Sequence, residues 1–286
     1  MGRGAGWPTL GYPSPPIEST SNITPRGLTT MPSEGDLECE TLIIGSGAGG
    51  GVVASTLAEK GMDVMVVERG AYIPRSERNN REFEMVSRMY ADRGMLTTND
   101  QAISLFAGQN LGGGTSVNWS VSLRPTEPLL NEWAREHDLP HLLTPEFSQC
   151  IDDVCEQLNV VPEVPHNRQN QMLLTGSECI GGPSGPLPQN VRGCEKHGYS
   201  QCGYCLFGCR NGFKRDVTEA CFNEKRDTGD VRIHDNVEIK RLVHRNGNVL
   251  YAEAVARSSN GELRSLKIRA KRYVVSAGGI FTPACC

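Results

Sequence analysis

The chain has 286 residues, of which 38% are hydrophobic and 22% are charged, a composition typical of globular proteins with a sizeable core. Its formal net charge of −4 and the lack of a basic run argue against binding to nucleic acid or an anionic membrane. No apolar stretch is long enough to cross a bilayer, and the N-terminus lacks the apolar core of a secretory signal. We therefore expect an intracellular protein.

The first 70 residues contain a lead-in and then an alternation of strand and helix. Residues 1–36 are rich in Pro, Gly, Ser and Thr and predict an extended segment without a core. A buried strand is predicted at 39–44, a helix at 48–60 and a second buried strand at 63–68. Strand, glycine turn, helix and strand form a βαβ unit, which predicts a parallel sheet and an α/β fold.

The middle of the chain predicts helices separated by irregular sequence. Apolar residues recur at helical spacing over 81–92. N-cap signals at Thr126, Thr144 and Asp216 predict helices that run to about residues 137, 158 and 226. Residues 161–193 are dense in Pro, Gly and Asn and predict a long irregular excursion.

The last part of the chain predicts β structure. Strands are expected at 231–233, 237–244, 252–257 and 263–268, with turns at Asn246-Gly247 and Asn260-Gly261. Val274 and Val275 predict one more buried strand, and Thr282-Pro283 is a typical opening for a helix, with Thr as N-cap.

A glycine-rich loop lies between the first strand and the first helix. Gly45, Gly47 and Gly50 form G-x-G-x-x-G, in which the glycines permit a tight turn, the approach of a pyrophosphate and close packing of the helix. The helix N-terminus favours that anion. Glu68 ends the second strand, 23 residues after Gly45, where its carboxylate can accept hydrogen bonds from a ribose diol and repel the 2′-phosphate of NADP. The pattern predicts a dinucleotide site that fits FAD or NAD.

A second glycine stretch, GQNLGGGTSVNWSVSLRP, spans residues 108–125. Its glycines and threonine offer backbone N–H groups and a hydroxyl to an anion. The stretch resembles the first signature of the glucose–methanol–choline (GMC) flavin oxidoreductases, although Gln109 and Ser122 depart from the usual residue types. Within that family the chain is most similar to long-chain (fatty) alcohol oxidases, through GYPSPP, TSVNWSVSLRP, EWAREHDLPHLLTPEF and CGYCLFGCRNGFK. The likeness runs from about Gly11 to Cys286.

The resemblance implies a Rossmann-type FAD-binding domain with β elements and part of a substrate-side insertion. We expect a lead-in over 1–36, an FAD-binding core over 37–125, an insertion over 126–193, a cysteine cluster and helix over 194–230, and returning β elements over 231–286. The motifs and the resemblance together place the FAD contacts at Gly45, Ser46, Gly47, Ala48, Gly49, Gly50, Glu68, Arg69, Gly112, Gly113, Gly114, Thr115, Asn118, Ile239, Ala277 and Gly278.

The reaction implied by the resemblance is oxidation of a primary, long-chain alcohol to the aldehyde. Hydride would pass to flavin N5, a histidine would take the hydroxyl proton, and oxygen would reoxidise the flavin. The terminal SAGGIFTP resembles the start of the second GMC signature, so the catalytic His and its His or Asn partner are expected beyond Cys286. Two alternatives stay open: a GMC dehydrogenase that passes electrons to a carrier, and a truncated product without catalytic activity.

Eleven cysteines are present, and three of them form C-x2-C-x3-C at Cys202, Cys205 and Cys209, with Cys194 upstream. Four thiolates suit zinc or an iron–sulfur cluster. The apolar and aromatic residues between the thiols equally suit a packed turn or a local disulfide, and the spacing matches no general ferredoxin pattern. We favour packing and predict no metal.

Overall fold

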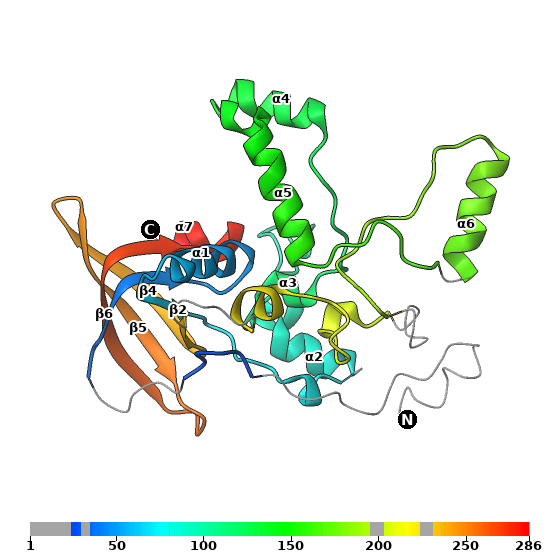
Figure 1. Ribbon diagram of the computed structural model, residues 1–286. Helices are drawn as coiled ribbons and strands as arrows, with labels where there is room; N and C mark the ends of the chain where they lie inside the picture. Colours follow the sequence, from blue (N-terminus) through cyan, green and yellow to red (C-terminus); the bar gives the residue numbers. More distant parts are fainter. Residues whose placement is uncertain are drawn as a thin grey trace. The chain divides into compact units, whose positions relative to one another are not determined.

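The computed structural model describes residues 24–29, 35–79, 81–166, 168–194, 203–223 and 231–285 (Figure 1). These residues fall into two compact units. The larger unit contains the described residues between 24 and 118, residues 204–212 and the described residues from 216 onward. The smaller unit contains the described residues between 119 and 203 and residues 213–215.

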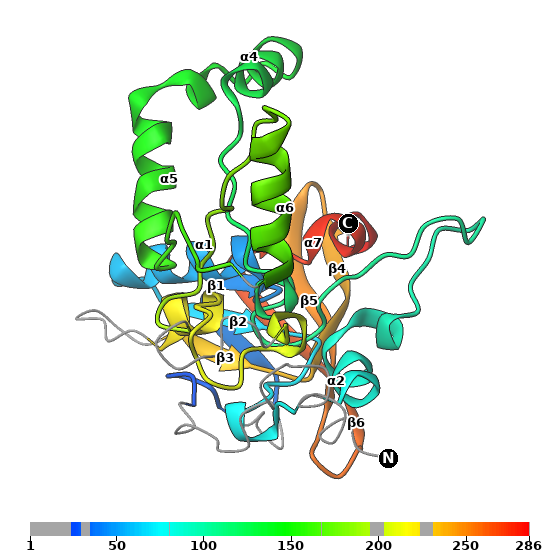
Figure 2. The ribbon, with the colours of Figure 1, turned by 90° about the vertical axis from the view of Figure 1, so that its right-hand side faces the viewer.

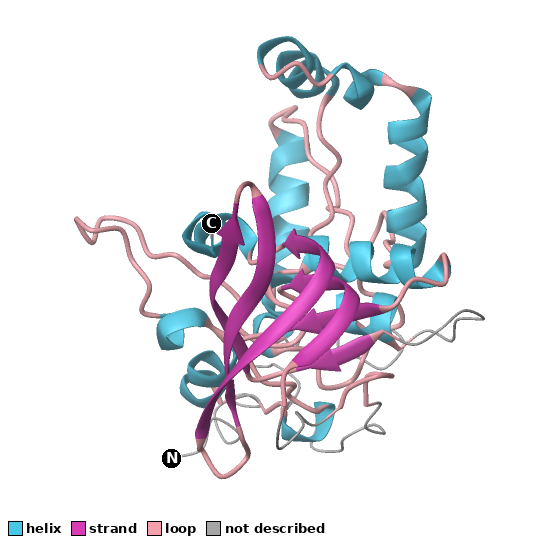
Figure 3. Cartoon of the chain, turned by 90° about the vertical axis from the view of Figure 1, so that its left-hand side faces the viewer, coloured by secondary structure: helices cyan, strands magenta, loops and turns pink. Residues whose placement is uncertain are grey.

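The larger unit is built on one six-stranded sheet in the order β3-β2-β1-β6-β5-β4. Figure 3 shows this sheet in magenta. Strands β3, β2, β1 and β6 are parallel, and β6, β5 and β4 form an antiparallel meander. This mixed sheet and its helices confirm the predicted α/β class. The strands are β1 (Leu37–Ile44), β2 (Val64–Val67), β3 (Arg232–His234), β4 (Val237–Arg245), β5 (Asn248–Arg257) and β6 (Leu263–Val275).

Strands β3 and β4 lie at opposite ends of the strand order, although only Asp235 and Asn236 separate them in the sequence. The three Cα–Cα steps from His234 to Val237 span at most about 11 Å, so the sheet has to curl until its two edge strands come close. The curl places residues of the antiparallel half, such as Ile239 and Ala254, in one buried cluster with Leu42, Ile44 and Met65 of the parallel half. The core of the unit lies inside this curl.

Helix α1 (Ala48–Glu59) connects β1 to β2 and covers the other face of the parallel strands (Figure 2). Its approach is close because a Cβ at Gly50 would lie 3.3 Å from Cγ2 of Ile43. Side chains alternate across a strand, so β1 serves both layers: Ile43 faces α1, and its neighbours Leu42 and Ile44 face the curl.

The remaining helices complete the two units. The larger unit also holds α2 (Glu82–Met89), α3 (Gly114–Val117) and α7 (Gly278–Cys285), whereas α4 (Glu127–Glu136), α5 (Pro145–Gln157) and α6 (Arg168–Cys179) belong to the smaller one. Thr144 caps α5, where its Oγ1 accepts a hydrogen bond from the N–H of Phe147 at 3.4 Å. Among the described helices, none has the length and apolar character that a membrane span requires.

Four predicted elements differ from the structure. Helix α6 lies inside the segment predicted to be irregular, where Pro- and Gly-rich flanks hide a run of helix-forming residues. Strand β6 continues through Val274 and Val275, because its second half pairs with β1. These two valines are half-buried rather than buried. Helix α7 begins at Gly278, four residues before the predicted N-cap Thr282, since the chain turns sharply at Gly278, where φ is +80°.

The fourth difference concerns the segment after Asp216. Instead of an α-helix, the described part is a π-helix over Thr218–Phe222, and Oδ1 of Asp216 accepts from the N–H of Glu219 at 3.1 Å, as the capping signal predicts. The predicted end of that helix, near residue 226, lies outside the described residues.

Ile268 is in register with both Leu37 of β1 and Ala252 of β5, at the point where β6 passes from one half of the sheet to the other. Its side chain is fully buried. We expect Ile268→Ala to lower the free energy of unfolding by about 3 kcal/mol, because it leaves a cavity where both halves meet. Lys267→Ala, at the exposed neighbour, should change it by less than about 0.5 kcal/mol. Guanidinium unfolding curves measure both, and equal effects would contradict this account of the core.

Candidate cofactor site

A pocket of about 390 Å³ lies in the larger unit at the carboxyl ends of β1 and β2. In open α/β sheets, this end of the parallel strands is where ligands bind. Both glycine-rich loops, strand β4 and the start of α7 supply its walls. The lining residues are Ile44, Gly45, Gly47, Ala48, Gly49, Val67, Glu68, Arg69, Gly108, Gln109, Gly113, Gly114, Val237, Glu238, Ile239, Lys240, Ser276, Ala277, Gly278 and Phe281.

The first glycine loop leaves room where an anion is expected. Gly45 has φ +98°, and a Cβ there would lie 2.4 Å from the carbonyl oxygen of Ser276. A Cβ at Gly50 would lie 1.9 Å from the carbonyl oxygen of Gly45, so this position has to be glycine. At Gly47, by contrast, a Cβ would meet no atom within 4 Å and would enter the pocket. The loop therefore fits a pyrophosphate at the N-terminus of α1.

Of the two acidic residues that line the pocket, Glu238 and Glu68, Glu68 is the buried one. Oε2 accepts from the backbone N–H of Ser46 at 3.0 Å and from its hydroxyl at 2.7 Å, and Oε1 accepts from the N–H of Gly70 at 2.8 Å. Burial raises the pKa of this carboxyl above its usual range, and the three hydrogen bonds and the nearby Arg69 oppose that rise. The carboxylate is held in place before any ligand arrives.

The second glycine loop packs directly against the first. A Cβ at Gly113 would lie 3.0 Å from Cα of Gly47, so the two loops are in backbone contact. Gly114 also lines the pocket, and a Cβ added there, as at Gly47, would meet no atom within 4 Å. Thr115 uses its hydroxyl within the unit, because Oγ1 donates to the carbonyl of Gly112 at 2.6 Å and accepts from the N–H of Val217 at 3.2 Å.

The far end of the pocket is formed by β4 and α7. The Arg69 guanidinium lies 4.2 Å from the centre of the Phe281 ring, a cation–π contact. Ile239 and Lys240 of β4 also line the pocket, and Lys240 forms an ion pair with Glu238 at 2.6 Å. The Phe281 ring and the Ile239 side chain offer apolar surface, and the Arg69 guanidinium offers a flat one, of the kinds that pack on an aromatic base.

Eleven of the sixteen predicted contact residues line the pocket: Gly45, Gly47, Ala48, Gly49, Glu68, Arg69, Gly113, Gly114, Ile239, Ala277 and Gly278. Ser46, Gly50 and Gly112 lie behind the wall, and Thr115 and the exposed Asn118 lie outside the lining. The other nine lining residues were not predicted as contacts: Ile44, Val67, Gly108, Gln109, Val237, Glu238, Lys240, Ser276 and Phe281. Gln109 and Phe281 lie within two of the sequence motifs, so their positions were usable signals. Lys240 reaches the pocket only through the curl of the sheet.

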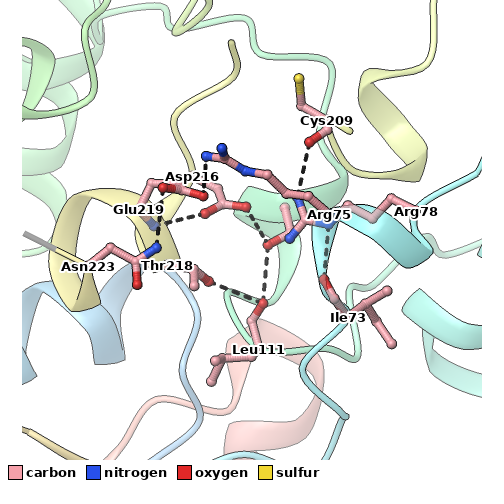
Figure 4. A network of polar contacts seen from close by, with 10 residues as sticks. Ile73, Arg75, Arg78, Leu111, Cys209, Asp216, Thr218, Glu219 and Asn223 are labelled. Carbon is pink, nitrogen blue, oxygen red and sulfur yellow. Dashed lines mark hydrogen bonds and ion pairs between the residues drawn. The ribbon is translucent and has the colours of Figure 1, made fainter. Parts of the chain in front are cut away.

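A buried polar network supports the second loop through residues that do not line the pocket (Figure 4). The carbonyl of Leu111 accepts from the hydroxyls of Ser116 at 3.2 Å and Thr218 at 3.3 Å. The Ser116 hydroxyl has one proton to donate, and its Oγ also lies 2.9 Å from Oδ2 of Asp216, so these two acceptors share that proton. The neighbouring Glu219 forms an ion pair with Arg75 at 2.5 Å. The network ties the loop to the π-helix and to the segment that follows β2.

The cysteine segment packs against the same region. Arg78 donates to the carbonyls of Ile73 and Cys209, at 3.1 and 3.4 Å (Figure 4). The hydroxyl of Tyr90 donates to the carbonyl of Leu206 at 2.8 Å, and Phe207 is buried. Cys202 lies outside the described residues, and within the described ranges no three His, Cys, Asp or Glu side chains come together as a metal site.

Two protein families match the chain. One, described as GMC oxidoreductase, matches residues 85–285, and one described as NAD(P)-binding Rossmann-like domain matches residues 43–104. The chain is 31% identical to the long-chain-alcohol oxidase FAO4B of Arabidopsis thaliana, over 93% of this chain and 37% of that protein. It is 27% identical to cholesterol oxidase of Mycobacterium tuberculosis, over 63% of this chain and 36% of that one. The chain thus spans about a third of the length of these relatives.

Solved structures show the same fold. Pyridoxine 4-oxidase from Mesorbium loti superposes with a TM-score of 0.57 and 16% identity, over 86% of this chain and 50% of that one. Formate oxidase superposes with a TM-score of 0.55 and 15% identity, over 87% of this chain and 47% of that one. At this identity the likeness concerns the fold alone.

The glycine geometry predicts that two similar substitutions have opposite consequences. Gly47→Ala should leave the unfolding free energy nearly unchanged and weaken FAD binding by about tenfold or more, because the new Cβ occupies the pyrophosphate position. Gly50→Ala should destabilise the unit by at least about 2 kcal/mol, because its Cβ collides with the carbonyl of Gly45. Thermal unfolding and quenching of flavin fluorescence separate the two effects. Normal FAD affinity in a folded Gly47→Ala variant would refute this placement of the pyrophosphate.

The ion pair of Arg75 and Glu219 gives a third prediction. Their side chains are 11% and 18% exposed, so Glu219→Ala leaves a nearly buried guanidinium without its partner. We expect a loss of about 3 kcal/mol of unfolding free energy. Glu84→Ala removes a carboxylate from the exposed pair with Arg81 and should cost less than about 0.5 kcal/mol. Urea unfolding of both variants is the measurement, and a similar small loss in both would show that the network does not support the loop.

Proposed function

Because this chain belongs to the GMC oxidoreductase family, we propose that its larger unit binds FAD in the pocket between the two glycine loops. FAD is the cofactor that the sequence predicts and that the family implies. The observation that carries the proposal is the open space at Gly47 and Gly114, where both loops present backbone to the same part of the pocket. We further propose that the protein oxidises a primary, long-chain alcohol to the aldehyde, with oxygen as acceptor. The likeness to the Arabidopsis oxidases supports this finer assignment.

Each wall of the pocket has a part in this proposal. The N–H groups at the start of α1 and in the second loop would hold the pyrophosphate. Glu68 would accept a hydrogen bond from the ribose, and Arg69, Ile239 and Phe281 would enclose the adenine. The flavin supplies the hydride acceptor, so the task of these residues is to bind and orient it.

Among the described residues that line the pocket there is no histidine. The base that takes the hydroxyl proton is therefore assigned to a residue outside this lining. His234, at the end of β3, does not qualify. Its Nδ1 lies 3.2 Å from Oγ1 and from the carbonyl oxygen of Thr29, and it is not among the residues that line the pocket.

A fourth prediction tests both parts of the proposal. Titration of the 286-residue chain with FAD should give one bound flavin per chain, with the resolved absorption bands of a protein-bound flavin. Anaerobic dodecan-1-ol should leave that flavin oxidised, because no described residue of the pocket lining is a histidine that could take the hydroxyl proton. The native protein purified from its source cells, given dodecan-1-ol and oxygen, should form peroxide and should form little with ethanol.

The outcomes that contradict the proposal are distinct. A chain that binds no FAD sinks the cofactor assignment. Bleaching of the flavin in the 286-residue chain would mean that a residue of this chain takes the hydroxyl proton, which contradicts the expected oxidised flavin. A native protein that oxidises cholesterol, or that needs an electron carrier instead of oxygen, overturns the assigned substrate or acceptor.

A further inference from the structure

The hydroxyl of Ser46 touches both glycine loops although it does not line the pocket. Oγ donates to Oε2 of Glu68 at 2.7 Å and accepts from the N–H of Gly112 at 3.0 Å. Ser46 is fully buried, and Gly112 is buried as well. One side-chain oxygen therefore joins the buried Glu68 of the pocket to the second glycine loop.

The hydrogen bonds leave the carboxylate of Glu68 with one acceptor position. A carboxylate offers about four such positions on its two oxygens. Ser46 occupies two positions on Oε2 through its N–H and its hydroxyl, and the N–H of Gly70 occupies one on Oε1. Because Glu68 lines the pocket, the remaining position on Oε1 is the one that a ligand hydroxyl can use.

We propose that Ser46 is a positioning residue for the cofactor, whose hydroxyl fixes Glu68 with Oε1 toward a ribose hydroxyl and holds the second loop against the pyrophosphate. The inference rests on the proposed function, because it takes this pocket as the FAD site. Removal of the hydroxyl would leave the buried N–H of Gly112 without an acceptor and would let the carboxylate rotate. The hydrogen bonds through which Ser46 connects the two loops would then be lost.

The protonation of Glu68 provides a second measurable effect besides affinity, namely the pH dependence of ligand binding. Burial raises the pKa of Glu68, and the Ser46 hydroxyl is one of the groups that lower it. A substitution at Ser46 leaves the other charged and titratable groups near Glu68 unchanged. These groups are Arg69, His234 and Asp235 at the end of β3, and the ion pair of Glu238 with Lys240 in β4. The first turn of α1 carries no acidic side chain. Without the hydroxyl, Glu68 takes up its proton at a higher pH. A protonated carboxyl is a weaker acceptor for the ribose, so ligand binding then fails at a higher pH than in the native chain.

The test compares Ser46→Ala and Ser46→Cys with Ser55→Ala. Ser55 is the matched control, a buried serine in α1 whose hydroxyl donates to the carbonyl of Val52 at 2.9 Å, outside the pocket lining. The probes are FAD and ADP-ribose, which contains the adenosine ribose but no flavin. We expect Ser46→Ala to bind ADP-ribose about tenfold more weakly and to lose binding at a higher pH. Ser55→Ala should keep the native affinity and pH profile.

A Glu68→Gln background separates positioning from general damage. Glutamine cannot ionise, so Ser46→Ala should cause no further shift of the pH profile in that background, and the two substitutions should be non-additive in binding. If Ser46→Ala fails to fold, Ser46→Cys, which keeps the volume and supplies a weaker donor, carries the test.

The results distinguish this inference from the proposed function. If the native chain binds neither FAD nor ADP-ribose, the pocket is not the cofactor site and the proposed function fails. If the native chain binds both, and folded Ser46→Ala and Ser46→Cys keep its affinity and its pH profile, only the role of Ser46 is overturned. Weaker binding with an unchanged pH profile also overturns it, since that result describes damage to packing rather than control of Glu68.

Discussion

The carboxylate of Glu68 is buried, and a buried charge has to be matched by donors. In this chain the donors are backbone and side-chain groups of Ser46 and the backbone of Gly70, so matching the charge also fixes the shape of the first glycine loop. The same Ser46 hydroxyl accepts from Gly112 and thereby fixes the second loop. The hydrogen bonds that stabilise the buried carboxylate of Glu68 therefore also fix the two glycine loops that form the walls of the pocket.

The sheet brings the rest of the pocket to that carboxylate. The N–H of Glu68 donates to the carbonyl of His234 at 2.9 Å, and its own carbonyl accepts from the N–H of Val237 at 2.8 Å. The end of β3 and the beginning of β4 therefore meet at Glu68, where the curled sheet brings its edge strands together. Because β4 begins at this junction, Ile239 and Lys240 lie in the pocket lining. Phe281 lies there because α7 follows β6, the strand next to β1.

Local motifs were predictable from the sequence, and tertiary placement was not. Gly45, Gly47 and Gly50 have spacing with a direct geometric meaning, and the hairpin turns at Asn246-Gly247 and Asn260-Gly261 lie where the sequence predicts them. In contrast, no pattern within β4 distinguishes Lys240 as a pocket residue, because its position follows from strand order. The hydrogen bond between Ser46 and Gly112 joins residues 66 positions apart, and no spacing rule predicts it.

The errors in the predicted elements have a common cause. The predicted N-cap at Thr282 has the right residue types, but α7 starts where β6 ends, at Gly278, and so the tertiary turn decides the boundary. Helix α6 was hidden because Pro and Gly in its flanks outweighed the helix formers inside it. In both places the decisive information lies outside the window in which propensity is read.

The most direct test of this account is a crystal structure of the chain with FAD bound. We expect the pyrophosphate within hydrogen-bonding distance of the N–H groups at the start of α1, a ribose hydroxyl on Oε1 of Glu68, and the bonds from Ser46 to Glu68 and from Gly112 to Ser46 preserved. FAD bound elsewhere, or a Glu68 carboxylate turned away from Ser46 to bind the ribose through both oxygens, would contradict it.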